Sequence, residues 1–455
     1  MNAIRNRIVA SAALSALLVA VWGSPSLAAP SSDNAPTITP APVANAQPTA
    51  PATPATKPAV AAPVAPARNV VMKWTLADAR ALLAYIDGSV VAEGLIAADY
   101  KPAALKAAIA AGEGDALDAA ASTSFTWLVE DLRDGRTPVK ARLQWFALDK
   151  DMDLNPTAAV MTSALANHDI AGTLTALDPT YPDYKVLKDA LATAEGAKRA
   201  QIQVNMDRWR WFSRDLGEAY LMTNVPEFQL RLVRRDKIVR TYRTIVGKPG
   251  KTATPQLAEV VEGVIFNPTW TVPQSIVVGE GYGKKYGSVA AAKAAGYAMS
   301  RSADGTITLV QQPGPRNSLG LMKLDMPNPH AIFLHDTPNR NLFNATFRAL
   351  SHGCVRTDRA TELAIAMAII GGGKTADEAA EISASGKYTK VPMIKTMPVY
   401  IGYFTVAKDI TGALSTFADI YGRDVPVLAS FKAPRAAKTG QRVSNEKVIK
   451  LDNPL

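Results

Sequence analysis

The hydrophobic pattern changes from a helical to an alternating period near Val204, and no other feature of the chain constrains its fold as much. Upstream, apolar side chains recur at the i, i+3, i+4, i+7 spacing of a helix buried on one face, as at Phe125, Leu128, Val129 and Leu132. Downstream, short runs rich in β-branched and aromatic residues predict strands at 220–225, 229–234, 237–246, 260–270, 331–334 and 398–406. We therefore predict an α+β fold, with a helical domain at 70–203 and a β-rich domain at 204–430.

Local signals add a turn and a helix to the β-rich part. A tight turn at 235–236 joins two of the predicted strands as a hairpin. Apolar residues that share one face predict a helix through Leu363, Ala366, Met367 and Ile370. Thr357 is its candidate N-cap residue, and the glycines that begin at Gly371 end it.

The regular pattern is interrupted between 274 and 312. This segment is rich in Gly, Ala, Lys and Tyr, but it lacks the Gly-x-x-x-x-Gly-Lys-Ser/Thr order of a phosphate-binding loop. We interpret it as a mobile insertion that covers a site in the β-rich domain.

The N-terminal segment has the three parts of a secretory signal peptide. Arg5 and Arg7 precede an apolar run at 8–21, and small residues occupy the cleavage positions that end at Ala28. We predict cleavage after Ala28, with an uncleaved anchor as the alternative, and no membrane span in the mature protein. Residues 29–69, rich in Pro, Ala and Thr, are expected to form an extended tether.

The charge balance is mildly basic, with 50 Lys and Arg against 40 Asp and Glu, a net charge of +10. This balance favours an anionic partner but is too small to indicate nucleic acid. Within the predicted tail at 431–455, residues 432–450 carry six basic residues and one acid, Glu446. Such a tail is either a solvated end or a contact with an anionic polymer.

Candidate catalytic groups gather in one stretch. Three of the four histidines, His330, His335 and His352, lie within 23 residues, and the single cysteine, Cys354, follows the last of them. One cysteine forms no intramolecular disulfide and no cysteine-based zinc site. Three interpretations remain open: a cysteine nucleophile with a histidine base, a metal site that includes Asp336, and a structural cluster.

Cys354 has the local sequence that a nucleophile needs. A nearby histidine could act as its base, and the dipole of the helix predicted to begin a few residues later would favour the thiolate. Gly353 lets backbone N–H groups approach a reacting carbonyl, as an oxyanion hole requires. Asp336 is a candidate triad acid, but adjacent residues in a strand point to opposite faces, which directs its side chain away from His335.

His335, together with Ser-His-Gly-Cys-Val-Arg at 351–356, resembles the signature of the L,D-transpeptidase (YkuD-type) catalytic domain. Flanking segments are similar to the YcbB-like multidomain periplasmic branch of that family: 246–249, 266–273, 313–320, 334–338, 341–343 and 420–424. The resemblance is strong over 204–430 and weaker over 70–200, which is similar to that branch's helical scaffold. The chain has no room for the small peptidoglycan-binding domain that is common in the branch, because 184–200 runs almost directly into 204–209.

The resemblance implies a fold, an activity and site residues. The implied fold is a helical scaffold domain followed by a β-rich catalytic domain with a capping insertion at 274–312. The implied activity needs no cofactor and no metal. Cys354 is implied as the nucleophile, and His335 as the general base, with its other ring nitrogen oriented by a backbone carbonyl. Oxyanion or substrate-binding roles are implied for Ser351, His352, Gly353, Arg356 and Trp270.

The implied reaction joins peptidoglycan stem peptides. A tetrapeptide stem is the donor, the side-chain amine of another stem's diamino acid is the acceptor, and a 3→3 cross-link forms in the periplasm with release of D-alanine. A β-lactam of the carbapenem class could form an adduct with the same cysteine. L,D-carboxypeptidase or D-amino-acid exchange activity, attachment of a protein to the wall, and a non-catalytic wall-binding role remain as alternatives.

Overall fold

The computed structural model describes residues 70–147, 149, 156–438 and 442–446. The predicted signal peptide at 1–28 and the predicted tether at 29–69 lie outside these residues. In the described part of the chain, no helix is long and apolar enough to cross a membrane.

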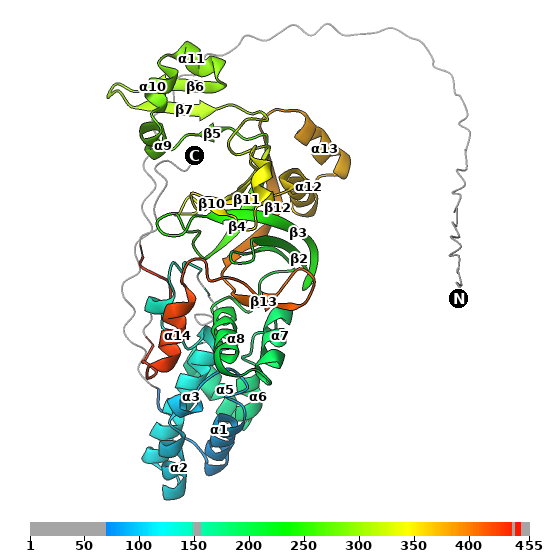
Figure 1. Cartoon of the computed structure of the whole chain (residues 1–455). Helices are drawn as coiled ribbons and strands as arrows, with labels where there is room; N and C mark the ends of the chain where they lie inside the picture. The colour runs from blue at the N-terminus through cyan, green and yellow to red at the C-terminus, as the bar shows by residue number, and fades with distance from the viewer. Residues whose placement is uncertain (1–69, 148, 150–155, 439–441, 447–455) are drawn as a thin grey trace, which may run out of the picture. The chain divides into compact units, whose positions relative to one another are not determined.

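Helices make up the first part of the described chain (Figure 1). They are α1 (Leu76–Gly88), α2 (Pro102–Ala111), α3 (Asp115–Asp134), α5 (Thr157–Ala166), α6 (Ile170–Thr175), α7 (Pro182–Leu191) and α8 (Gly196–Trp209), with short 3-10 helices at Ala97–Tyr100 and Val139–Ala141. The predicted face of α3 is fully buried in a core shared with α1, α2, α5 and α6: Phe125, Leu128, Val129 and Leu132. Helices α7 and α8 belong to a second core, which also contains residues of strands. The predicted boundary at 203 falls inside α8, and the first strand begins at Ala219.

A nine-stranded sheet forms the centre of the second part, in the order β10-β3-β11-β9-β8-β4-β12-β1-β2. Its strands are β1 (Ala219–Asn224), β2 (Gln229–Arg234), β3 (Lys237–Gly247), β4 (Leu257–Phe266), β8 (Met322–Asp325), β9 (Leu334–His335), β10 (Ala349–Ser351), β11 (Val355–Thr357) and β12 (Thr389–Gly402). Because β2 also pairs with β3, the sheet closes on itself. The predicted α+β class, helical first and β-rich second, is confirmed.

Backbone conformation explains where predicted and observed strands differ. Arg235 and Asp236 both have positive φ, 48° and 58°, which suits the tight turn of the predicted β2–β3 hairpin. The strand predicted at 260–270 is split, because Asn267 adopts φ 48° after β4 ends at Phe266. Of the strand predicted at 331–334 only its last residue is in a strand, because Ala331 has φ 53°.

The predicted helix is present as α12 (Ala360–Ile370), and it packs against β4, β8 and β12. It ends at Gly371 as predicted. Its predicted N-cap is wrong, because Thr357 belongs to β11 and the residue before the helix is Arg359, with φ 48°. Helices α13 (Ala376–Ala384) and α14 (Asp424–Lys432) and the hairpin of β13 (Val406–Lys408) and β14 (Leu414–Thr416) complete this part.

The insertion at 274–312 is a small folded unit rather than an irregular loop. It contains α9 (Gln274–Gly279), α10 (Tyr282–Tyr286), α11 (Val289–Ala294), β6 (Tyr297–Arg301) and β7 (Ile307–Gln311). β7 pairs with β6 and with β5 (Trp270–Thr271), the strand just before the insertion. It has its own apolar core, which includes Val277, Tyr297 and Leu309. Its mobility stays a prediction.

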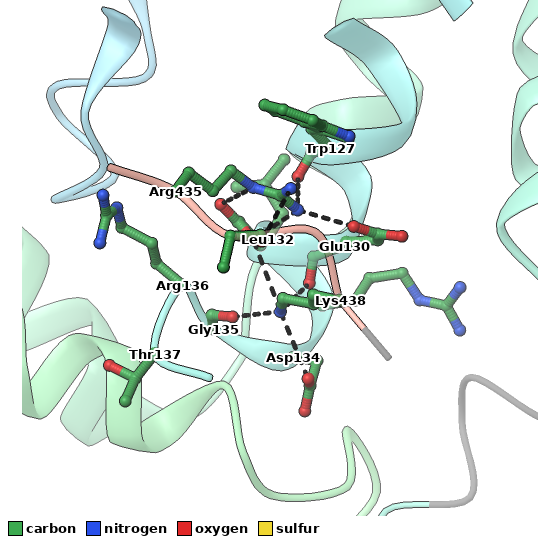
Figure 2. Close-up of polar contacts among 12 residues, drawn as sticks. Trp127, Glu130, Leu132, Asp134, Gly135, Arg136, Thr137, Arg435 and Lys438 are labelled. Carbon is green, nitrogen blue, oxygen red and sulfur yellow. Dashed lines mark hydrogen bonds and ion pairs between the residues drawn. The ribbon is translucent and has the colours of Figure 1, made fainter. Parts of the chain in front are cut away.

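The described part of the basic tail packs on the helical domain (Figure 2). The guanidinium of Arg435, only 2% exposed, pairs with Asp131 at 2.9 Å and Glu130 at 2.6 Å on α3. The ammonium of Lys438 pairs with Asp134 at 3.3 Å. The interpretation of a solvated end is therefore wrong for these two residues, because buried carboxylates of α3 bind their charges.

Candidate active site

Three neighbouring strands place a histidine between two cationic side chains. β9 pairs with β11 so that His335 lies opposite Arg356, and it pairs with β8 so that His335 also lies opposite Lys323. Residues in register on adjacent strands project from the same face of a sheet. Arg356, His335 and Lys323 therefore form one row across the sheet.

Cys354 lies in the bend between β10 and β11, one residue before β11, and is 8% exposed. Its thiol donates a weak hydrogen bond to the carbonyl of Ala331, 3.6 Å away. Burial raises the pKa of the thiol to about 11, against the lowering effects of a backbone hydrogen bond at Phe333 and the charges of Lys323 and Arg356. The resting thiol is thus protonated at neutral pH, and its attack on a carbonyl requires a base.

The predicted helix dipole does not activate Cys354. β11 follows the cysteine directly, and α12 begins only at Ala360. The expectation that a helix N-terminus favours the thiolate is therefore wrong: the pKa of Cys354 is raised, because the cost of burying a thiolate exceeds the favourable electrostatic effects around it.

His335 has the protonation state of a general base. Its Nδ1 lies 2.5 Å from the carbonyl oxygen of Asp336. Because a carbonyl only accepts, Nδ1 carries the ring proton and Nε2 keeps its lone pair. Burial, followed by the charge of Arg356, lowers the pKa of His335 to about 3, although the backbone hydrogen bond with Asp336 acts in the opposite direction.

The carboxylate of Asp336 faces away from the imidazole of His335. It accepts hydrogen bonds from the N–H of Leu321 at 2.9 Å and from the guanidinium of Arg340 at 2.8 Å. A Cβ built on Gly320 would lie 2.4 Å from this side chain, so only glycine leaves room for it. Asp336 thus orients His335 through its backbone carbonyl and does not act as a triad acid.

The bend that carries Cys354 is held by internal hydrogen bonds. The hydroxyl of Ser351 donates to the carbonyl of Cys354 at 2.6 Å and accepts the N–H of Gly353 at 3.1 Å. Gly353 has φ 125°, a conformation that favours glycine. The N–H of Gly353, a predicted oxyanion donor, is therefore engaged within the bend.

Thr254, which is fully buried, fixes the peptide unit that precedes the nucleophile. Its hydroxyl accepts the N–H of Gly247 at 2.8 Å and donates to the carbonyl of Gly353 at 2.7 Å. In a planar trans peptide, the carbonyl of Gly353 and the N–H of Cys354 point in opposite directions. Thr254 therefore sets the direction of the Cys354 N–H, a donor of the predicted oxyanion hole.

The segment at 420–424 supports Thr254 from behind. The hydroxyl of Tyr421 donates to the carbonyl of Gly247 at 2.5 Å and accepts the N–H of Thr254 at 3.3 Å. The guanidinium of Arg423 donates to the carbonyl of Thr254 at 2.9 Å and to the side-chain oxygen of Gln144, in the segment that follows the helix Val139–Ala141. This chain of contacts joins the helical domain to the catalytic bend.

The side chains of three other candidate residues lie in different surroundings. His352 is exposed, His330 packs its ring 4.3 Å from that of Phe146, and Trp270 is half-buried in β5 at the base of the insertion. The described residues contain no group of three or more His, Cys, Asp or Glu side chains arranged to hold a metal. The catalytic and binding roles of Cys354, His335 and the other predicted residues stay predictions.

Two residues of the cluster are absent from the set that the sequence predicts. Lys323 carries no signal, because lysines are mostly exposed and a buried one is unexpected. Thr254 stands in an ordinary polar stretch. The sequence points to Thr254 only indirectly, through the segment at 420–424. This segment resembles the family, and its side chains hold Thr254 in place.

Comparisons with known proteins identify two domains in the chain. Residues 218–401 match the family model of the L,D-transpeptidase catalytic domain, YkuD, and residues 67–191 match the model of a scaffold domain. A curated relative from Haemophilus influenzae named "Putative L,D-transpeptidase" is 29% identical over 219 residues, which cover 45% of this chain and 44% of the relative. The chain therefore matches less than half of that relative's length.

Solved structures of the same description are more distant. An L,D-transpeptidase from Mycobacterium smegmatis is 12% identical over 40% of this chain and 58% of its own, with a TM-score of 0.21. L,D-transpeptidase 3 from Mycobacterium tuberculosis, in complex with a faropenem-derived adduct, is 10% identical over 41% and 60%, also with a TM-score of 0.21. These TM-scores are too low to carry an argument. The two family models show that the chain contains a YkuD-type L,D-transpeptidase catalytic domain preceded by a scaffold domain, an architecture consistent with the YcbB-like branch.

Proposed function

We propose that the protein is a peptidoglycan L,D-transpeptidase that forms 3→3 cross-links through a thioester on Cys354. The supporting observation is the pairing of β9 with β11, which puts the neutral imidazole of His335 beside the strand that Cys354 precedes. A protonated thiol and a neutral imidazole are the starting state for general-base catalysis.

The first half-reaction acylates the enzyme. The Sγ of Cys354 attacks the carbonyl carbon of the third residue of a tetrapeptide stem, and the thiol proton passes to Nε2 of His335. The oxyanion that forms needs an N–H donor, for which the Cys354 amide is aimed by Thr254. The carbon–nitrogen bond then breaks, and D-alanine leaves with the proton from His335.

The second half-reaction transfers the acyl group. The side-chain amine of a second stem attacks the thioester carbonyl and gives one proton to His335. The carbon–sulfur bond breaks, the sulfur of Cys354 regains the proton, and an amide joins the two stems. The bond between Nδ1 of His335 and the carbonyl of Asp336 keeps the imidazole in the same orientation through both steps.

The same thioester also serves the alternative reactions. Water as acceptor makes the protein an L,D-carboxypeptidase, a free D-amino acid makes it an exchange enzyme, and a protein amine attaches that protein to the wall. We favour the stem amine on the expectation that the insertion at 274–312, which is folded and pairs through β7 with β5 (Trp270–Thr271), covers the site. A folded cover excludes water, the competing acceptor.

The proposed setting is the periplasm, reached by the signal peptide predicted at 1–28. The proposed partners are donor and acceptor stem peptides, and a carbapenem is a proposed covalent inhibitor of Cys354. Neither half-reaction as written involves a cofactor or a metal ion.

Mass spectrometry of purified muropeptides after incubation with the protein tests the proposal. We expect 3→3 dimers and free D-alanine, both lost in Cys354→Ala. His335→Ala should slow the reaction at least about 10²-fold, the usual contribution of a general base. Tripeptide without dimer would identify a carboxypeptidase, and full activity of the Cys354 variant would refute the thioester.

A further inference from the structure

A lysine without a charged partner is buried beside the catalytic cysteine. Lys323 is 9% exposed, and its ammonium lies 4.3 Å from the centre of the Phe333 ring. Apart from this ring, it forms no hydrogen bond or ion pair with any residue that the structure describes. Burial of a charged group without a counter-ion is costly, so such lysines are rare unless an anion binds them.

Lys323 lines a cavity of about 120 Å³ that is next to Cys354, separated from the thiol by Ala331. Ala331, whose carbonyl accepts the thiol hydrogen of Cys354, lines the same cavity, as does Phe333. This volume is several times that of one water molecule, about 30 Å³ in the liquid. The cavity therefore has room for a carboxylate group that belongs to a ligand held at the thiol.

The other polar groups of the cavity already have partners. The carboxylate of Asp325 pairs with Lys390 at 2.5 Å. The side chain of Asn328 donates to the carbonyl of Ile332 at 2.6 Å and accepts the N–H groups of Ile332 and His330. Lys323 is therefore the group in this cavity that is left to bind a ligand, and its charge selects an anion.

The row across the sheet reinforces this selection. The side chain of Arg356, on the other side of His335, has no hydrogen bond or ion pair with a described residue, and its Nε is buried without an acceptor. Both cations act on Cys354 and His335 and face no unpaired carboxylate within the row. His335 therefore has a positive charge on both sides in the row, and both charges also act on the thiol.

We propose that the Lys323 cavity is a subsite for a carboxylate of the donor stem peptide, held beside Cys354 while the thiol attacks. This inference rests on the proposed function for the identity of its substrate. The carboxylate belongs either to the terminal residue, which leaves, or to the side chain of the third residue. In both cases Lys323 selects stems with a free carboxylate near the reacting carbonyl.

Two thiol reagents that differ by one carboxylate test the subsite without transpeptidation. Iodoacetate and iodoacetamide both alkylate Cys354, and only iodoacetate carries a negative charge. In the full-length protein, we expect the ratio of their rates to exceed the ratio for free cysteine in the same buffer at least about tenfold. A ratio equal to that of free cysteine would overturn the proposal, and this measurement needs no variant.

Substitutions then assign the effect to Lys323. Lys323→Met should slow both reagents, because the Lys323 charge lowers the pKa of the thiol, but it should slow iodoacetate about tenfold more than iodoacetamide. Lys323→Arg should keep most of the rate ratio. Lys395→Met, which removes an exposed lysine paired with Glu218, is the control for net charge. Equal loss with both reagents would mean that Lys323 acts only on the thiol, and this result also overturns the subsite.

Peptide substrates identify the source of the carboxylate. Tetrapeptide stems are compared with stems amidated at the C-terminus or at the third side chain, in the wild type and in Lys323→Met. Amidation of the carboxylate that binds Lys323 should raise KM at least about tenfold in the wild type. The same amidation should have little effect on KM in Lys323→Met. Equal KM values for all three stems in the wild type would refute the carboxylate subsite even if cross-linking itself is confirmed.

Discussion

Replacement of Thr254 by valine removes one buried hydroxyl and keeps the shape of the side chain. Two hydrogen bonds disappear, those with the N–H of Gly247 at 2.8 Å and with the carbonyl of Gly353 at 2.7 Å. Each buried backbone group left without a partner costs about 1–3 kcal/mol, so the free energy of unfolding should fall by about 2–6 kcal/mol.

The effect on catalysis should be separate from the effect on stability. Without Thr254, the peptide between Gly353 and Cys354 can rotate, and the N–H of Cys354 is no longer held toward the oxyanion. Loss of one oxyanion donor slows acyl transfer about 10²–10³-fold. We therefore expect a saturating carbapenem to acylate Thr254→Val about 10²-fold more slowly than the wild type. The carbapenem concentration that gives the half-maximal rate should change by a smaller factor.

The assay is the single-turnover rate of carbapenem acylation, followed by mass spectrometry, beside thermal unfolding of each variant. Thr254→Ser keeps the hydroxyl and should recover most of the rate. Thr223→Val is the matched control, because Thr223 is equally buried and its hydroxyl has no partner among the described residues. A folded Thr254→Val protein with the wild-type acylation rate would refute the role of Thr254.

Four further results are expected. Because burial raises the pKa of Cys354 to about 11, its iodoacetamide alkylation should accelerate about tenfold per pH unit from pH 7 to pH 10, and a plateau below pH 8.5 would contradict this. Transpeptidation should survive EDTA, and loss that zinc restores would support a metal site. Replacement of 279–308 by a short linker should leave Cys354 reactive toward a small β-lactam but lower the ratio of 3→3 dimer to tripeptide, and an unchanged ratio would mean that the insertion is not a lid. Arg435→Ala leaves the buried carboxylate of Asp131 without its closest cation and should cost about 3–5 kcal/mol of stability in chemical denaturation, whereas Lys432→Ala, at an exposed position, should change it little.

The local features of this fold could be predicted, because they depend on residues near each other in the chain. The buried face of α3 follows from its helical period, and the β2–β3 hairpin follows from two predicted strands around a short polar turn. Strand ends could not be predicted at Asn267 and Ala331, because nothing in the local pattern requires positive φ at these residues.

The residues that resemble the catalytic signature could also be found from sequence, because Cys354 and His335 keep their spacing and flanks. The protonation states of these two residues could not be predicted from the sequence. The sequence near Cys354 favours a thiolate, but burial makes the thiol neutral, and burial depends on the whole β-rich domain.

Only the tertiary structure decided which residues surround the nucleophile. Lys323 reaches the site because β8 pairs with β9 in one register, and a shift by one residue would turn its side chain to the other face. Thr254 contacts Gly353 across 99 positions of the chain, and Arg435 contacts Asp131 across 304. Sequence determined the helices, the turns and the candidate catalytic pair, because these depend on local chemistry. The structure determined which cations flank His335, how the peptide between Gly353 and Cys354 is oriented, and where the tail is anchored. These features depend on strand register and burial, which are properties of the folded chain as a whole.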